Sequence, residues 1–185
     1  VAVAINADGT YAYVCNFGSG TVSVIVVDPD STTFNEVVET ITVGTNPIDV
    51  EVNPDGSRVY VANAGSSNVS VIDGDNTSEM HHQVVATVAT GSSVKSVAVT
   101  PDGTRVYVGT NNGYVVLDAQ TNGVVGTVAT GSSTKSVAIT PDGALLVLLT
   151  TNGTVVIYDI QPGSSSEDEV VATVATGSSV KSVVV

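Results

Sequence analysis

Short runs of β-branched and apolar residues, separated by Gly, Asn, Asp and Ser, set the hydrophobic pattern of the chain. One group of four such runs covers Lys95–Thr100, Thr104–Thr110, Gly113–Asp118 and Val124–Ala129. Runs of this length that are rich in Val, Thr, Ile and Tyr predict strands, and the Pro-Asp-Gly and Asn-Gly sequences between them predict tight turns. Helical periodicity with capping residues is absent from the sequence, so the pattern predicts an all-β protein.

The group of four strands recurs along the chain at a nearly fixed interval. Asp-Gly turns follow one another at steps of 47, 47 and 40 residues. They begin at Asp8, Asp55, Asp102 and Asp142. A second marker, Gly-Ser-Ser-x-Lys-Ser, begins at Gly91, Gly131 and Gly177. The two markers together divide the chain into four repeats.

Four antiparallel strands in 40 to 47 residues are typical of one blade of a β-propeller. We therefore predict a single domain over 1–185, a four-bladed β-propeller whose blades cover about 1–47, 48–94, 95–134 and 135–180. A β-sandwich and a β-solenoid are the alternatives, but a sandwich needs no repeat and a solenoid has shorter coils. Alternating strand positions are expected to form the core. They include Val59, Val61, Val106, Val108, Leu146 and Leu148.

Three repeats share a tetrapeptide in their second strand. It reads Tyr13-Val14-Cys15-Asn16, Tyr60-Val61-Ala62-Asn63 and Tyr107-Val108-Gly109-Thr110. These sequences resemble the Tyr-Val-Thr-Asn signature of YVTN-type β-propeller repeats, which are found in surface-layer and secreted proteins. The resemblance implies an extracellular and often structural role. The fourth repeat departs from it with Val147-Leu148-Leu149-Thr150, and propellers of that family commonly have seven blades.

The charge of the chain is strongly acidic. Eighteen acidic side chains against five basic ones give a net charge of −13, which argues against nucleic acid and against a polybasic membrane surface as partners. The longest apolar runs, such as Val24–Val27 and Ala144–Leu149, are too short to span a bilayer. We expect an extracellular or cell-surface protein without a membrane span.

Groups that could support catalysis are few in the sequence. Asp49 and Glu51 are the only carboxylates in a first strand, which we consider too few for a catalytic or metal site. The sequence has neither a nucleophile-elbow serine nor a phosphate-binding loop before a helix. The basic residues all occupy strand starts, typical of structural positions, although a ring of lysines could attract an anion. They are Arg58, Lys95, Arg105, Lys135 and Lys181. We therefore predict that the protein is not an enzyme.

The single cysteine and the two histidines offer little chemistry on their own. Cys15 stands where other repeats have Ala62 and Gly109, which favours a small buried residue over a reactive thiol. His81 and His82 are adjacent, and neighbours on a strand point to opposite faces, so they would not share a metal ion. We expect both histidines at the surface.

A polar insertion in the second repeat is the one candidate metal site. Asp73, Asp75 and Glu79 alternate in a way that could supply oxygen ligands to Ca²⁺, although the spacing is not that of an EF-hand and a solvated loop is the alternative. No other cofactor is expected. Sequons for N-glycosylation, which matter only in a secreted protein, begin at Asn68, Asn76 and Asn152.

The outer strands and the two ends of the chain suggest self-association. Val84–Thr90 and Val170–Thr176 carry no charge, and uncharged edge strands pair readily with other chains. Both ends fit the first strand of a repeat, so the chain has one first strand more than a closed four-bladed disc needs. The surplus strand belongs either to a neighbouring subunit or to a longer propeller that was cut. The residues expected in assembly are Val1, Ala2, Val3, Ala4, Ile5, Val183, Val184 and Val185.

These features together lead to one functional expectation. We predict a non-enzymatic extracellular structural protein that assembles with itself into a surface layer or filament, through β-edge contacts and exchange of end strands. The alternative is a propeller module that binds a ligand or a partner protein.

Overall fold

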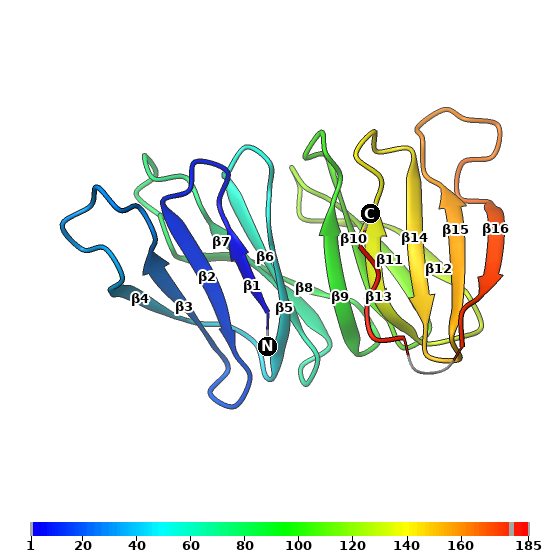
Figure 1. Ribbon diagram of the computed structural model, residues 1–185, viewed down its shortest axis with the longest axis horizontal. Helices are drawn as coiled ribbons and strands as arrows, with labels where there is room; N and C mark the ends of the chain where they lie inside the picture. Colours follow the sequence, from blue (N-terminus) through cyan, green and yellow to red (C-terminus); the bar gives the residue numbers. More distant parts are fainter. Residues whose placement is uncertain (1, 178–179, 185) are drawn as a thin grey trace. The chain divides into compact units, whose positions relative to one another are not determined.

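All regular elements in the described part of the chain are strands. The computed structural model describes residues 2–177 and 180–184, in which sixteen strands form four antiparallel sheets of four strands each (Figure 1). None of the described segments is a helix that is long and apolar enough to cross a membrane. The chain divides into two compact units, residues 1–94 and residues 95–185, and the boundary between them is the predicted boundary between the second and third repeats.

The first unit contains two sheets, each built in the order of the chain. The first sheet contains β1 (Val3–Ile5), β2 (Tyr11–Asn16), β3 (Thr21–Val26) and β4 (Val37–Thr42). The second sheet contains β5 (Pro47–Val52), β6 (Arg58–Asn63), β7 (Asn68–Asp73) and β8 (Val84–Ala89). Each sheet is therefore an up-and-down meander, the architecture expected of a propeller blade.

The second unit repeats this arrangement. Its first sheet contains β9 (Val94–Val99), β10 (Arg105–Thr110), β11 (Gly113–Asp118) and β12 (Val124–Ala129). Its second sheet contains β13 (Thr134–Ile139), β14 (Leu145–Thr150), β15 (Thr154–Asp159) and β16 (Val170–Ala175). The predicted strands of the third repeat match the observed ones to within one residue at each end.

The turns between the first and second strands follow the predicted chemistry. The glycine of each Asp-Gly turn has a positive φ, from 71° to 75° across the four repeats, a conformation that glycine adopts without strain. The aspartate before it accepts a backbone hydrogen bond, as in Thr10 N to Asp8 Oδ1 at 3.0 Å and Ser57 N to Asp55 Oδ1 at 2.9 Å. The turn sequence thus fixes the register of each first hairpin.

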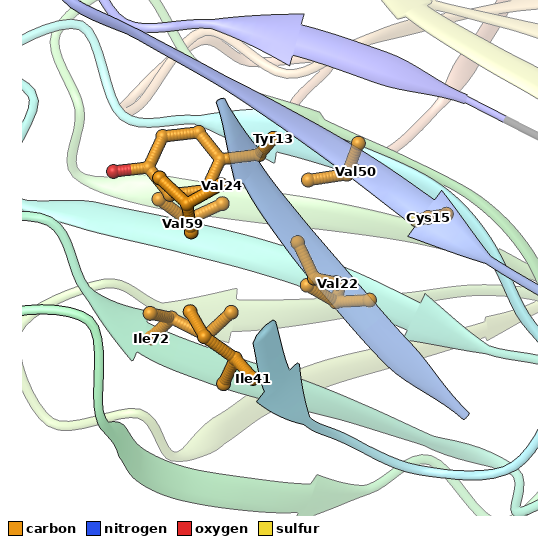
Figure 2. Close-up of a cluster of buried hydrophobic side chains, with 9 residues drawn as sticks. Tyr13, Cys15, Val22, Val24, Ile41, Val50, Val59 and Ile72 are labelled. Carbon is orange, nitrogen blue, oxygen red and sulfur yellow. The ribbon is translucent and has the colours of Figure 1, made fainter. Parts of the chain in front are cut away.

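The core of each unit is made of aliphatic and tyrosine side chains from neighbouring sheets. In the first unit, Tyr13, Val22 and Val24 pack with Val50 and Val59 between the two sheets (Figure 2). In the second unit, Leu146 and Leu148 pack with three tyrosines from β10, β11 and β15. The predicted core residues are all fully buried. They are Val59, Val61, Val106, Val108, Leu146 and Leu148.

The two ends of the chain differ from the expected exchange of end strands. At the N-terminal end, β1 pairs with β2 of its own sheet, and Ala2 O accepts a hydrogen bond from Cys15 N at 3.0 Å. At the C-terminal end, residues 180–184 form no strand, although Val183 N donates to Ser136 Oγ at 3.4 Å. The expected first strand over 181–185 is therefore not formed in the described residues, and the assembly residues Val1 and Val185 lie outside them.

Candidate functional site

The innermost strand of the second sheet carries two carboxylates on one face. Asp49 and Glu51 lie two residues apart on β5, so their side chains project to the same side of the sheet. Val50, between them, points the other way and is buried in the core of the first unit. The same positions of the other innermost strands are uncharged. They hold Ala2 and Ala4, Ser96 and Ala98, and Ser136 and Ala138.

The β5 backbone holds the two carboxylates in place. Asp49 lies opposite Ala62 and Glu51 opposite Tyr60 on β6, and the register shifts between Pro47 and Asp49. Beyond this irregularity the ladder with β6 is continuous to the end of the strand. Asp49 Oδ1 accepts a hydrogen bond from Val50 N at 3.1 Å. The acid pair therefore stands on a regular strand of the sheet and not on a loop.

The surroundings of Glu51 favour its protonated form. Desolvation by the surrounding protein, although part of the side chain reaches solvent, and the charge of Asp49 together raise the pKa of Glu51 to about 7. A carboxyl group with this pKa takes up and releases protons at neutral pH, which is the requirement for a general acid–base catalyst. The sequence shows these two carboxylates, but a count of carboxylates does not reveal desolvation.

Cys15 faces a different electrostatic situation. Burial, with the Asp49 charge as the second cause, raises the pKa of its thiol to about 12. The thiol is therefore protonated at neutral pH and is no nucleophile. The prediction that Cys15 is a small buried residue is confirmed.

The two histidines lie elsewhere than predicted. His81 and His82 are in the β7–β8 loop, not on a strand, and both are partly buried with their ring centroids 3.6 Å apart. The expectation that they point to opposite faces at the surface is wrong, because His82 has a positive φ of 62°, which strand geometry does not include.

The residues proposed for Ca²⁺ do not gather around a common point. Asp73 Oδ1 lies 3.3 Å from Arg58 Nη1, and Asp73 Oδ2 accepts a hydrogen bond from Ser78 Oγ. Asp75 Oδ1 accepts from Thr77, and Glu79 is exposed. Among the described residues, no three His, Cys, Asp or Glu side chains are placed to hold a metal ion.

Comparison with known proteins places these features in context. The family model described as "Lactonase, 7-bladed beta-propeller" matches residues 1–98, more than half of the chain. No curated protein matches the sequence.

Solved structures give similar folds. A hydrazine synthase of Kuenenia stuttgartiensis is 25% identical with a TM-score of 0.79, and the match covers 93% of this chain and 47% of that one. A proposed 6-phosphogluconolactonase of Bacteroides uniformis is 17% identical with a TM-score of 0.79, over 95% and 55% of the two chains. A second proposed 6-phosphogluconolactonase, of Bacteroides fragilis, is 19% identical with a TM-score of 0.78, also over 95% and 55%. The chain spans about half the length of these proteins, which all share its β-propeller fold.

These findings correct the functional prediction. The matched family is one of lactonases, and two similar structures carry a lactonase description, which contradicts a non-enzymatic structural protein of a surface layer or filament. The prediction failed because it treated the absence of a familiar catalytic motif as the absence of chemistry.

Proposed function

Because the chain belongs to the lactonase, 7-bladed beta-propeller family, we propose that it forms part of an enzyme that hydrolyses a lactone. Sugar lactones are the substrate class, since two similar structures are described as proposed 6-phosphogluconolactonases. The observation that carries the proposal is the match of the lactonase family model to residues 1–98, within which Asp49 and Glu51 on β5 are the acidic residues that break the repeat.

Glu51 acts as the general base in this proposal. Its ionised carboxylate takes a proton from a water molecule while the water oxygen attacks the lactone carbonyl carbon. The tetrahedral intermediate then collapses, the bond from the carbonyl carbon to the ring oxygen breaks, and protonated Glu51 returns the proton to that oxygen. One lactone and one water thus give one open-chain hydroxy acid, with Glu51 restored.

Asp49 sets the proton affinity of Glu51 and does not touch the substrate. A second negative charge two residues away disfavours ionisation of Glu51, and this is the second cause of its raised pKa after desolvation. Asp49 is therefore a positioning residue whose effect is visible in a pH profile.

The first experiment replaces the base. Glu51→Gln keeps the size of the side chain and removes the proton acceptor, so we expect kcat/KM for glucono-δ-lactone and its 6-phosphate to fall about 10²- to 10⁴-fold. Glu39→Gln, at an exposed position of β4, is the matched control and leaves the rate unchanged. Equal rates in the two variants, or a wild-type protein that hydrolyses neither lactone, would contradict the proposal.

The second experiment tests Asp49 through pH. The kcat/KM of the wild-type protein is expected to rise with pH through about 7, since Glu51 must be ionised to act. Asp49→Asn removes the neighbouring charge and moves this rise to lower pH, with a maximal rate close to that of the wild type. An unmoved profile with a lower plateau would assign Asp49 a merely structural role.

We also propose that the repeats are of the YVTN type. Support comes from Tyr13, Tyr60 and Tyr107, which occupy the same place in β2, β6 and β10 and are all buried. A cell-surface location and association with a second copy remain proposals, which cell fractionation and size-exclusion chromatography would test.

A further inference from the structure

The β7–β8 loop, residues 74–83, connects two strands of the second sheet and packs against β2 of the first sheet. Its last turn is closed by hydrogen bonds from His82 N to Asp73 O at 2.8 Å and from Asp73 N to Gln83 O at 2.9 Å. The same turn precedes the outermost strand in every sheet, and its left-handed position is filled elsewhere by residues that tolerate positive φ. These are Asn35, Asn122 and Asp168. His82 therefore breaks the repeat at a position where Asn or Asp fits the backbone better.

The two imidazole rings pack on the tyrosines of β2. The centroids of His82 and Tyr11 lie 5.0 Å apart with the planes at 88°, and those of His82 and Tyr13 lie 5.9 Å apart at 79°. His81 lies 3.6 Å from His82 and 5.7 Å from Tyr11. These contacts join the second sheet to the first, and we call them the histidine latch, made of Tyr11, Tyr13, His81 and His82.

Three polar atoms of the histidine latch are buried without a hydrogen-bond partner. They are His81 Nε2, His82 Nε2 and the hydroxyl of Tyr13. Among the described residues around them, no three His, Cys, Asp or Glu side chains are placed to hold a metal ion. In such packing a neutral ring tolerates an unpartnered nitrogen far better than a charged ring does.

This packing disfavours protonation of His82. Burial, followed by the charge of His81, lowers the pKa of His82 to about 4. The titratable groups around the pair are the two tyrosines and the carboxyls of the neighbouring turns. They are Tyr11, Tyr13, Asp8, Asp28, Asp73 and Asp75. None of these carboxyls is hydrogen-bonded to either imidazole in the structure, so a proton taken up by His82 meets no acceptor in the closed latch.

We propose that the histidine latch is a pH-dependent contact between the two sheets of the first unit: proton uptake by His82, which is stacked on His81 and packed on Tyr11 and Tyr13, frees the loop 74–83 from β2. A cavity of about 290 Å³ adjoins the rings and is lined by Asp28 together with Tyr11, His81 and His82. An imidazolium that leaves Tyr13 enters this cavity, where the Asp28 carboxylate offers the partner that the closed position lacks. The release is therefore directed toward the β3–β4 loop, which carries Asp28.

Hydrogen exchange of the whole protein tests the release. Between pH 7 and pH 4.5, after correction for intrinsic exchange, we expect backbone exchange in residues 74–83 to rise about tenfold or more. His82→Asn, which supplies the residue found at positions 35 and 122, keeps the turn and removes the titrating ring, so its exchange stays flat over this range. Asp28→Asn is expected to shift the release to lower pH, because the released imidazolium loses its partner.

A second measurement keeps the proposal testable if the variants fold poorly. The imidazole carbon-bound protons of the wild-type protein are followed by NMR, and the His82 signal is expected to titrate together with the change in exchange. Loop exchange that stays constant while His82 titrates would overturn the release, and so would an unchanged response in His82→Asn.

Discussion

Each unit has a contact between the loop before an outermost strand and the neighbouring sheet, but the side chains that make this contact differ between the units. In the first, the β7–β8 loop places His81 and His82 on Tyr11 and Tyr13. In the second, the β15–β16 loop places Glu167 and Asp168 at the same positions of the repeat. There Glu167 Oε1 lies 3.2 Å from Arg105 Nη1, and Tyr114 donates a hydrogen bond to Asp168 Oδ1 at 3.4 Å.

The difference shows which part of the contact the repeat dictates. Tyr13 and Tyr107 occupy equivalent positions of the repeat and both are fully buried, so the two units share the tyrosine that the loop covers. The loop side chains that cover this tyrosine are imidazole rings in the first unit and carboxylates in the second. The fold therefore requires a covering loop, while the covering side chains decide how the contact responds to pH and salt.

The largest expected effect on stability comes from removing the buried tyrosine that the two units share. Tyr13→Ala and Tyr107→Ala each delete a buried aromatic ring, so each is expected to lower the stability of its own unit by about 3–5 kcal/mol. Hydrogen exchange in β2 and β10 under mild denaturant measures the two losses separately. A loss of stability that is several kcal/mol smaller in one unit than in the other would show that the two tyrosines are not equivalent.

The pH dependence of stability is expected next in size. Since the pKa of His82 is about 4 in the folded protein and 6.5 otherwise, the unfolded state binds more protons between these values, and stability falls as pH falls through that window. Glu51 acts in the opposite sense, because its raised pKa makes the folded state bind the extra proton between 4.5 and about 7. The two contributions must therefore be separated.

The comparison of wild type with His82→Asn achieves this separation, since Glu51 contributes equally to both. The stability difference between them is expected to change by about 1–2 kcal/mol from pH 7.5 to pH 4.5, a value reduced for the partial exposure of the ring. In the second unit, the Gly163 amide and Arg105 lower the pKa of Glu167, so its contact weakens only below pH 4.5. Weakening of both units over the same pH range would contradict the comparison.

Removing single tyrosine hydroxyl groups is expected to affect the two units differently. Tyr13→Phe removes a hydroxyl that has no hydrogen-bond partner, so stability is expected to change by less than about 0.5 kcal/mol. Tyr114→Phe removes the donor to Asp168 and is expected to destabilise by about 1 kcal/mol. Denaturant titrations of the two variants measure both changes, and a reversed order would contradict the assigned roles.

Salt gives the smallest effect. Raising the ionic strength to about 1 M screens the Arg105–Glu167 pair, whose side chains are about one-third exposed, and is expected to raise exchange in residues 161–169 by less than about twofold. Residues 79–83 are expected to show a smaller change, because the histidine latch contains no ion pair and the Arg58–Asp73 pair holds the start of the loop through Ser78. Equal salt sensitivity in residues 79–83 and 161–169 would argue for an ionic component in the latch.

The fold was predictable from the sequence because the strands and turns of every sheet have local sequence signals. Asp-Gly turns, runs of Val and Thr, and the repeat interval placed β10, β11 and β12 within one residue of their observed ends. The expected strand is missing at the C-terminal end of the described residues. There, Val183 contacts Ser136 through a single side-chain hydrogen bond, without the ladder that defines a strand.

The site was less predictable because its properties arise from surroundings. The sequence shows that Asp49 and Glu51 break the repeat, but it does not show that desolvation brings the pKa of Glu51 near 7. In the same way, adjacent histidines were placed on a strand, whereas a left-handed turn at His82 brings their rings together. A search for departures from the repeat would have singled out both places.

The outermost strands β8 and β16 have the same six residues, Val-Val-Ala-Thr-Val-Ala, and each skips its second valine in pairing with its neighbour. Each of β7 and β15 therefore has a partner strand whose sequence also occurs in the other unit, and the short connecting chain favours pairing within its own sheet. Refolding of this protein is expected to pass through mispaired species that must separate before the native sheets form.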